Sequence, residues 1–250
     1  MKLSVPLAVA MTAALALSGC QKQADAEFGA KVRAYLLENP EVLREMAQRL
    51  QEKDKLAEAG AAKAVIDKFR AQIERDPRDI VINPTGTITV VEFFDFNCAY
   101  CKVVAPEVVK LVQENPDVRL VLKQFAFQTE DAIAAAKVTL TDAARPKALP
   151  LYRELLAQKP LDAAAIDRSL AAVGLDPAAT RAAAGAPAIA QQIEDAHALA
   201  AQLKIEGTPA FIVGDRVIHG ADVDGLRAAI AAQRTAGLKR PPATAPASPT

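Results

Sequence analysis

The chain has 250 residues and is 51% hydrophobic, which is enough apolar material to build a sizeable core. Its 30 lysines and arginines balance its 30 aspartates and glutamates, so no basic excess supports nucleic-acid binding. Aromatic residues make up only 4% and alanine is abundant, a composition that favours helices.

Residues 1–19 have the features of a targeting segment. Lys2 supplies a positive start, and the apolar stretch of residues 3–17 is too short to span a membrane. Leu17, Ser18 and Gly19 precede Cys20 in a pattern that resembles a bacterial lipobox. Cleavage before Cys20 would leave that thiol to carry a diacylglycerol, and the alternative is an ordinary cleavage site with a free thiol.

Residues 20–75 are predicted to form a tether and a helical stalk. A helical pattern starts at Glu27, and Asn39-Pro40 interrupts it, with Asn39 as the expected cap of a second helix that reaches about Arg75. Two apolar patches flank a polar bridge of residues 51–63. They are made of Val42, Leu43, Met46 and Leu50, and of Val65, Ile66, Phe69 and Ile73. Either both patches pack on the following domain, or the first patch binds a second copy of the chain.

Residues 76–237 alternate between strand and helix patterns, which predicts an α/β domain. Strands are expected at residues 80–82, 87–96, 118–125, 209–213 and 216–219. A helix follows the second strand at 102–112, and short helices are expected at 131–144, 147–157, 162–172, 177–183 and 188–203. Asp222 should cap a last helix that runs to about Arg234, with Gly237 as the stop after it, and residues 238–250 read as a disordered tail.

A Cys-x-x-Cys motif lies between the long strand and the helix that follows it. Cys98 falls at the helix N-terminus, where free backbone N–H groups favour a thiolate, and Cys101 lies one turn further on. This arrangement indicates a redox site. The alternatives are a structural disulfide and half of a zinc site, but zinc needs about four ligands. Only Cys20 and two histidines remain, none in a ligand-spaced pair, so no metal site is expected.

The sequence of residues 92–101, Glu-Phe-Phe-Asp-Phe-Asn-Cys-Ala-Tyr-Cys, is followed far downstream by Gly-Thr-Pro-Ala-Phe at 207–211. Together these motifs resemble the DsbA-like branch of the thioredoxin superfamily, in particular its ScsC and Com1-type periplasmic members, over about residues 35–230. The resemblance implies a thioredoxin fold with an inserted helical subdomain at about 129–204. It also implies protein disulfide oxidase or isomerase activity that needs no cofactor beyond the Cys98–Cys101 disulfide.

Cys98 is the expected nucleophile because it lies nearer the helix start, and Cys101 is the expected buried, resolving cysteine. Ala99 and Tyr100 are placed to tune the Cys98 thiolate and to contact the partner protein. A well-known oxidant of the family has a histidine between its cysteines. This chain has none, so we expect a milder oxidant or an isomerase.

Three further residues complete the predicted site. Glu92 shares strand parity with Phe94 and Phe96, so its side chain should be buried near Cys101 rather than exposed. The resemblance assigns to it the relay of the Cys101 proton. The resemblance also makes Pro209 a cis-proline that faces the cysteines, with Thr208 presenting its backbone to a substrate chain.

The predicted function is that of a bacterial periplasmic oxidoreductase, anchored to a membrane through lipidated Cys20. Gln21 slightly favours the outer membrane. Its expected partners are unfolded or misoxidised envelope proteins, a membrane redox partner and further copies of itself, with a trimer favoured by the resemblance. One alternative is copper(I) binding by the same dithiol, in line with copper tolerance. Another is an inert scaffold, which leaves the cysteine motif unexplained.

Overall fold

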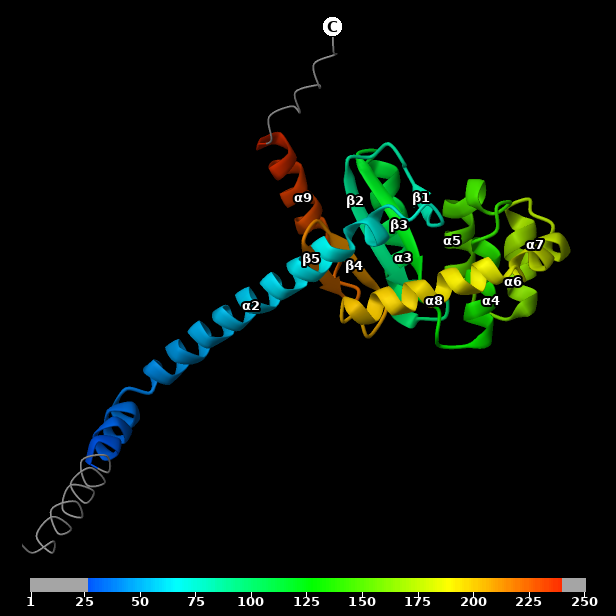
Figure 1. Ribbon diagram of the computed structural model, residues 1–250. Coiled ribbons are helices and arrows are strands. Elements are labelled where there is room, and N and C mark those ends of the chain that lie inside the picture. The colour runs from blue at the N-terminus through cyan, green and yellow to red at the C-terminus, as the bar shows by residue number, and fades with distance from the viewer. Residues whose placement is uncertain (1–26, 240–250) are drawn as a thin grey trace, which may run out of the picture. The chain divides into compact units, whose positions relative to one another are not determined.

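The computed structural model describes residues 27–239 and consists of two compact units (Figure 1). The N-terminal unit ends at Glu58 and the C-terminal unit begins at Ala59. This division lies inside the long helix α2 (Glu41–Glu74). The predicted signal segment, Cys20 and most of the predicted C-terminal tail lie outside the described residues. Among the helices of residues 27–239, none is both long enough and apolar enough to cross a membrane.

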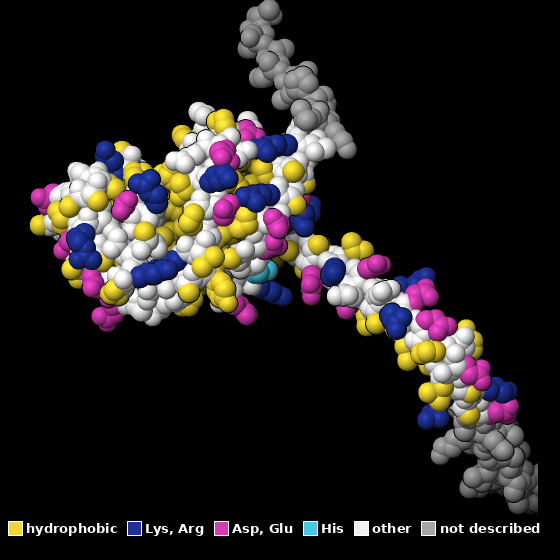
Figure 2. All heavy atoms as spheres, turned by 180° about the vertical axis from the view of Figure 1, so that it is seen from behind, with side chains coloured by type: hydrophobic (Ala, Val, Ile, Leu, Met, Phe, Trp, Pro, Cys, Tyr) yellow, Lys and Arg dark blue, Asp and Glu magenta, His cyan; other side chains and the backbone are white. Residues whose placement is uncertain are grey.

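The N-terminal unit consists of a helix of residues 27–38 and the first part of α2. The amide nitrogen of Asn39 donates a hydrogen bond to the Tyr35 carbonyl at 2.9 Å. Asn39 therefore closes the first helix through its side chain, whereas the sequence predicts that it caps the second. Large apolar side chains of this unit stand exposed among charged ones along both helices (Figure 2). They include Phe28, Tyr35, Leu43, Met46 and Leu50.

A five-stranded sheet with the order β1-β3-β2-β4-β5 forms the centre of the C-terminal unit. Its strands are β1 (Ile80–Ile82), β2 (Ile88–Phe94), β3 (Val118–Gln124), β4 (Ala210–Val213) and β5 (Arg216–His219). Strands β2 and β3 are parallel, and the other neighbouring pairs are antiparallel. A parallel pair requires a crossover connection, and helix α3 (Ala99–Glu114) provides it. The predicted α/β class and thioredoxin fold are confirmed.

The helical insertion follows β3, and Figure 1 shows it in green to yellow beside the sheet. Its elements are α4 (Glu130–Thr139), the 3₁₀ turn η1 (Arg145–Lys147), α5 (Ala148–Ala157), α6 (Ala163–Ala172), α7 (Pro177–Ala184) and α8 (Pro187–Gln202). The side chains of Thr129, Asp162 and Asp176 accept backbone N–H bonds at the starts of α4, α6 and α7. Two helix ends differ most from prediction. Helix α4 stops at Thr139 instead of residue 144, and the C-terminal helix α9 (Val223–Lys239) continues through Gly237.

The two faces of the sheet bury alternate residues of its strands. Val90 and Phe94 of β2 belong to a core that α3, α5 and α9 help to build. Val91 and Phe93 point to the opposite face and pack with residues of α2 and α8. Because side chains alternate along a strand, Glu92 lies on the same face as Val90 and Phe94, toward α3 and α5.

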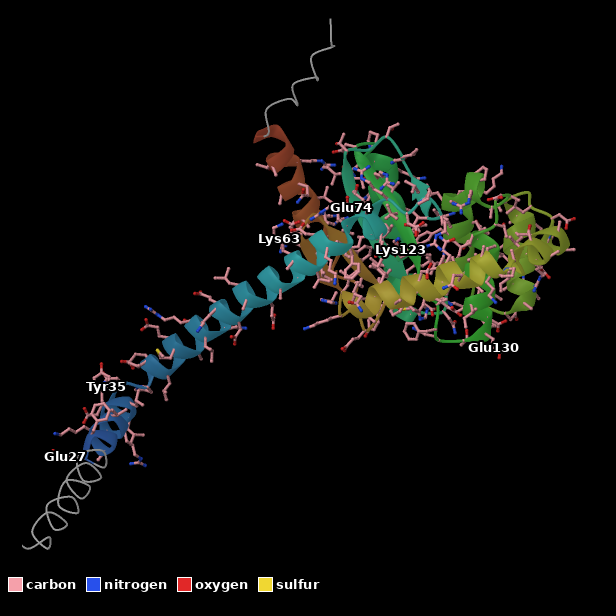
Figure 3. The ribbon with its side chains drawn as sticks, in the orientation of Figure 1. Glu27, Tyr35, Lys63, Glu74, Lys123 and Glu130 are labelled. Atoms are coloured by element: carbon pink, nitrogen blue, oxygen red, sulfur yellow. The ribbon has the colours of Figure 1, made fainter. Side chains whose placement is uncertain are left out.

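The last turns of α2 pack on the sheet within the C-terminal unit. Ile66 and Ile73 of this segment are fully buried, so the second predicted apolar patch packs on this unit. The carbonyls at the end of the helix accept hydrogen bonds from β3. Lys123 Nζ donates to the Gln72 carbonyl at 2.6 Å, and Arg119 donates to the Glu74 carbonyl at 2.8 Å. Figure 3 labels Glu74 at the end of α2 and Lys123 on β3. These hydrogen bonds fix the end of α2 relative to β3, just before the chain enters β1.

Candidate active site

Cys98 occupies the N-cap position of α3, just beyond the end of β2. Its backbone is extended, and its sulfur accepts a hydrogen bond from the Cys101 N–H at 3.4 Å. Both cysteines are free thiols, with Cys98 4% exposed and Cys101 fully buried. Of the two cysteines, Cys98, the predicted nucleophile, is the one that keeps a small exposed surface.

The surroundings of Cys98 favour its thiolate form. The hydrogen bond from the Cys101 side chain lowers the pKa of Cys98 most, and contacts with Thr208 and with the backbone N–H groups of Cys101 and Tyr100 lower it further. These contacts outweigh the opposing effect of burial and bring the pKa of Cys98 to about 5. The direction is the one predicted for a cysteine at a helix start.

Cys101 has the opposite electrostatic environment. The hydrogen bond it donates to Cys98, its burial and the nearby Glu92 carboxyl all raise the pKa of Cys101 far above that of a free thiol. Cys101 therefore holds its proton while Cys98 is ionised. An asymmetric pair of this kind has one sulfur ready to attack and one that needs a proton acceptor before it can react.

Glu92 lies fully buried on β2, with Leu122 of β3 and Phe211 of β4 as its cross-strand neighbours. Burial is the main cause that raises the pKa of Glu92, to about 8, and the Cys98 charge adds to it. A hydrogen bond from Tyr152 partly offsets the increase. The side chain is thus within electrostatic reach of both cysteines, and its carboxyl changes charge close to neutral pH.

The loop before β4 brings Thr208 and Pro209 to the cysteines. The Thr208–Pro209 peptide bond is cis. The Cys98 thiol donates a hydrogen bond to the Thr208 carbonyl at 3.2 Å, across 110 residues of sequence. The Thr208 hydroxyl is buried and has no partner among the described residues, so it is free to donate to a Cys98 thiolate. The structure therefore brings Glu92, Cys98, Cys101 and Thr208 together.

Ala99 and Tyr100 form the first turn of α3, and both are exposed. Tyr100 is 67% exposed, and Val103, one helical turn along the same face, is 69% exposed. Two large side chains of α3 therefore stand exposed on the face of the helix next to Cys98.

The sequence analysis did not identify two buried residues of the site. Asp95 is fully buried, and its carboxylate accepts backbone N–H bonds from Asn97, Phe127 and Gln128 at 2.6–3.1 Å. It fastens the turn before Cys98 to the loop after β3. The second residue is Tyr152 of α5, which lies 60 positions from Glu92 in sequence. Its one distinguishing feature in the sequence is that no other Phe, Tyr or Trp occurs in residues 129–204.

The remaining predicted feature of the site, lipidated Cys20, lies outside the described residues. Within residues 27–239, no group of three or more histidines, cysteines or acidic residues is arranged to hold a metal ion. The copper alternative depends on the Cys98–Cys101 dithiol alone.

Comparison with known protein families gives two matches. Residues 89–231 match the DSBA-like thioredoxin domain, a segment that contains the sheet from β2 onward, both cysteines and the helical insertion. This match covers more than half of the chain. The chain belongs to the DSBA-like thioredoxin family. Residues 25–57 match the N-terminal domain of the copper resistance protein ScsC.

Solved structures support this assignment. A linker-deletion mutant of Proteus mirabilis ScsC is 25% identical, with a TM-score of 0.65, and the match covers 85% of this chain and 95% of that one. A thioredoxin-like oxidoreductase from Silicibacter pomeroyi is 32% identical, with a TM-score of 0.62, over 66% of this chain and 98% of that one. A periplasmic thioredoxin-like protein from Salmonella enterica is 28% identical, with a TM-score of 0.59, over 67% and 96%. A comparison with curated proteins found no match.

Proposed function

We propose that this protein is a thiol–disulfide oxidoreductase of the bacterial envelope that acts on exported proteins through Cys98 and Cys101. The observation that carries the proposal is the asymmetry of the two thiols at the start of α3. Cys98 has a pKa lowered to about 5, whereas Cys101 is buried and holds its proton. Family membership and the resemblance to a periplasmic relative agree with this role.

In the oxidising direction, a substrate thiolate attacks the Cys98 sulfur of the Cys98–Cys101 disulfide. The disulfide breaks, its electron pair goes to the Cys101 sulfur, and protonated Glu92 supplies the proton that this thiolate needs. A second substrate thiolate then attacks the substrate sulfur of the mixed disulfide. Cys98 leaves as a thiolate, which its hydrogen bonds stabilise, and the substrate gains a disulfide while the enzyme becomes a dithiol.

In the reverse direction, the Cys98 thiolate attacks a wrong disulfide of the substrate, and one substrate sulfur leaves. Cys101 then loses its proton to the Glu92 carboxylate and attacks the Cys98 sulfur, which releases the second substrate sulfur. In isomerisation, the substrate thiolate that left first attacks another substrate disulfide, and the thiolate released there attacks the substrate sulfur of the mixed disulfide. Cys98 then leaves as a thiolate before Cys101 reacts. Tyr100, Ala99 and the backbone of Thr208 beside Pro209 are the surface on which the substrate chain would rest.

The placement in the cell follows from the first residues of the chain. We expect export by the segment of residues 1–19, followed by lipidation of Cys20, with Gln21 favouring the outer membrane. A membrane redox partner would restore the oxidised state of Cys98 and Cys101. Intact mass spectrometry of the native protein tests the anchor, and a product with an unmodified Cys20 would contradict it.

An insulin-reduction assay with the wild type and two single variants tests the function. Cys98→Ser should abolish reduction because the attacking sulfur is lost. Cys101→Ser should still attack but should accumulate a covalent enzyme–substrate complex, visible on non-reducing gels, because no sulfur resolves it. If Cys98→Ser reduces insulin as well as the wild type does, thiol–disulfide exchange at this site is refuted.

A second candidate is copper(I) binding by the same dithiol. The observation that favours it is the match of residues 25–57 to a domain named for copper resistance. Thiolates are soft ligands that suit copper(I). Titration of the reduced protein with copper(I) against a competing chelator separates the candidates. Stoichiometric binding that Cys98→Ser abolishes, in a protein without exchange activity, would favour the copper reading.

A further inference from the structure

Glu92 is a buried acid, and the one side chain among residues 27–239 that hydrogen-bonds to it comes from a distant part of the chain. The Tyr152 hydroxyl lies 3.0 Å from each of the two carboxyl oxygens. Glu92 is fully buried, and Tyr152 is 1% exposed. None of the groups that set the pKa of Glu92 is a cation in the part of the chain that the structure describes. The Tyr152 O–H is therefore the polar group that faces the Glu92 carboxyl in this part of the structure.

The packing of α5 holds this hydroxyl in position. The Tyr152 ring contacts the Phe94 ring edge to face, with 5.2 Å between their centroids, two residues beyond Glu92 on β2. Leu151 and Leu155 of the same helix are fully buried. The helical insertion thus anchors one side chain directly beside the strand that ends at the cysteines.

We propose that Tyr152 is a positioning residue for the thiol–disulfide reaction, which keeps the Glu92 carboxyl group in place and stabilises its ionised form by a hydrogen bond. The inference deepens the proposed function and rests on the role given there to Glu92. It assigns to the helical insertion a part in proton transfer as well as in covering the sheet.

The electrostatics of the pair fit this role. The titratable groups that face Glu92 are the thiols of Cys98 and Cys101 from α3 and the Tyr152 phenol from α5. Burial and the nearby Glu92 charge raise the pKa of Tyr152 well above that of an exposed tyrosine. Tyr152 therefore remains a donor while Glu92 titrates. Its hydrogen bond favours the carboxylate, the form that must accept the proton from Cys101 when a mixed disulfide is resolved.

Tyr152→Phe is the test variant because it removes the hydroxyl and leaves the ring to pack on Phe94. A hydrogen bond to a charged group is strong enough that its loss should raise the pKa of Glu92 by about one to two pH units. The carboxylate would then be roughly 10-fold to 100-fold scarcer at neutral pH. The rate of resolution by Cys101 should fall by a similar factor.

The experiment uses exported protein that carries Cys20→Ser, so that Cys98 and Cys101 are its only thiols. Reduced protein reacts with oxidised glutathione, and stopped-flow mixing follows the resolution of the Cys98–glutathione disulfide across the pKa of Glu92, about 8. We expect the midpoint of the rate profile to move to higher pH in Tyr152→Phe. Ser169→Ala is the matched control, because it removes a buried hydroxyl of the same insertion that has no hydrogen-bond partner in the described structure. Its midpoint should equal that of the wild type.

A double-mutant comparison distinguishes positioning from a purely structural role. With Glu92→Gln in place, Tyr152→Phe should cause no further change in the profile. An equal effect of Tyr152→Phe in both backgrounds would overturn the inference. If Glu92→Gln leaves the wild-type rate profile unchanged, Glu92 carries no proton in the reaction. That result would refute the role of Tyr152 without contradicting the proposed thiol–disulfide exchange.

A carboxyl-carbon NMR titration of Glu92 decides the same point without any activity. The pKa of Glu92 should be higher in Tyr152→Phe than in the wild type. Equal values in the two proteins would overturn the inference, even if both exchange disulfides normally. A protein that shows no exchange at all would contradict the proposed function. The NMR titration would still show whether Tyr152 sets the pKa of Glu92.

Discussion

At the scale of single residues, the site works through unequal environments of similar groups. Cys98 and Cys101 are three positions apart, yet contacts lower the pKa of the first and raise that of the second. The helix start supplies N–H groups to Cys98, while the core surrounds Cys101 and Glu92. The proposed reaction depends on this difference, because it needs an ionised attacking sulfur and a resolving sulfur that keeps its proton until the mixed disulfide has formed.

The first prediction concerns the ionisation of Cys98. Alkylation of the reduced protein by iodoacetamide should rise with pH around a midpoint near 5, because the thiolate is the nucleophile. Cys101 should be modified only after unfolding. Mass spectrometry of the labelled peptides at each pH distinguishes the two sites, and faster labelling of Cys101 would reverse their roles.

The second prediction concerns the cost of burying Glu92. Its pKa is raised from 4.5 to about 8, so the folded state binds this proton more tightly than the unfolded chain does. The associated stability is complete below pH 4.5 and is lost as the pH rises to about 8, by about 1.4 kcal/mol for each pH unit. Glu92→Gln should therefore gain stability over the wild type as the pH increases. Urea unfolding of both reduced proteins at several pH values measures this gain, and a constant difference would contradict it.

At the scale of elements, the C-terminal part of α2 and strand β3 are joined through a buried charge. The Lys123 ammonium binds the Asp79 carboxylate and the Gln72 carbonyl, and the side chains of Lys123 and Asp79 are each only 4% exposed. Arg70 of α2 adds an ion pair to Asp215 in the turn between β4 and β5. Gly214 precedes it with a positive φ of 61°, a conformation that glycine adopts without strain. These contacts attach the helix end to the face of the sheet opposite the cysteines.

The third prediction follows from the buried pair. Lys123→Met should destabilise the protein by about 3–5 kcal/mol, because it leaves the Asp79 carboxylate buried without its cation. Arg49→Met is the control, since Arg49 pairs with Glu45 where both side chains are more than half exposed. An exposed pair contributes about 0–1 kcal/mol. Equal losses of stability in the two variants, measured by urea unfolding, would show that the Lys123 pair does not support the fold.

At the scale of the whole molecule, the N-terminal unit displays an apolar surface that its own helices do not cover. Leu43, Met46 and Leu50 are each between 56% and 60% exposed at helical spacing on α2. Neighbouring apolar side chains exposed on one surface often mark an interaction site. We propose that further copies of the chain bind there. Several active sites on one frame would raise the effective concentration of thiols around a substrate, which suits isomerisation.

The fourth prediction is that the exported protein forms a homo-oligomer, a trimer as the family resemblance implies. Sedimentation equilibrium of a Cys20→Ser form should show it, and Leu43→Glu combined with Met46→Glu should dissociate it by placing charges on the apolar stripe. Arg44→Glu with Gln48→Glu is the matched control on the same turns. A wild-type monomer at protein concentrations of tens of micromolar would refute the prediction.

Deletion of residues 20–50 tests whether the oligomer matters for activity. Oxidation of dithiols needs one active site at a time, so it should survive the deletion. Isomerisation should decrease, because the substrate would no longer meet several sites before it diffuses away. If scrambled-ribonuclease refolding is as fast with the deletion as without it, the N-terminal unit has no part in isomerisation.

The sequence alone determined the order of the elements and the position of the Cys-x-x-Cys motif between a strand and a helix. Strand alternation and helical periodicity are local properties, so they fixed β1 and β5 to the residue and most other elements to within a few residues. The Cys-x-x-Cys motif between a strand and a helix is also a local feature, and it predicts redox chemistry. Helix ends were less predictable. α9 passes Gly237, because glycine is tolerated within a helix at a modest cost.

Only the tertiary structure decided what surrounds the reactive pair. Tyr152 meets Glu92 across 60 residues, and Thr208 meets Cys98 across 110, so no local pattern could report either contact. The structure also separated the two apolar patches of α2, burying Ile66 and Ile73 and leaving Leu43 and Met46 exposed. An amphipathic pattern in the sequence indicates only that a helix has an apolar face. The partner of that face depends on what the rest of the chain brings to it.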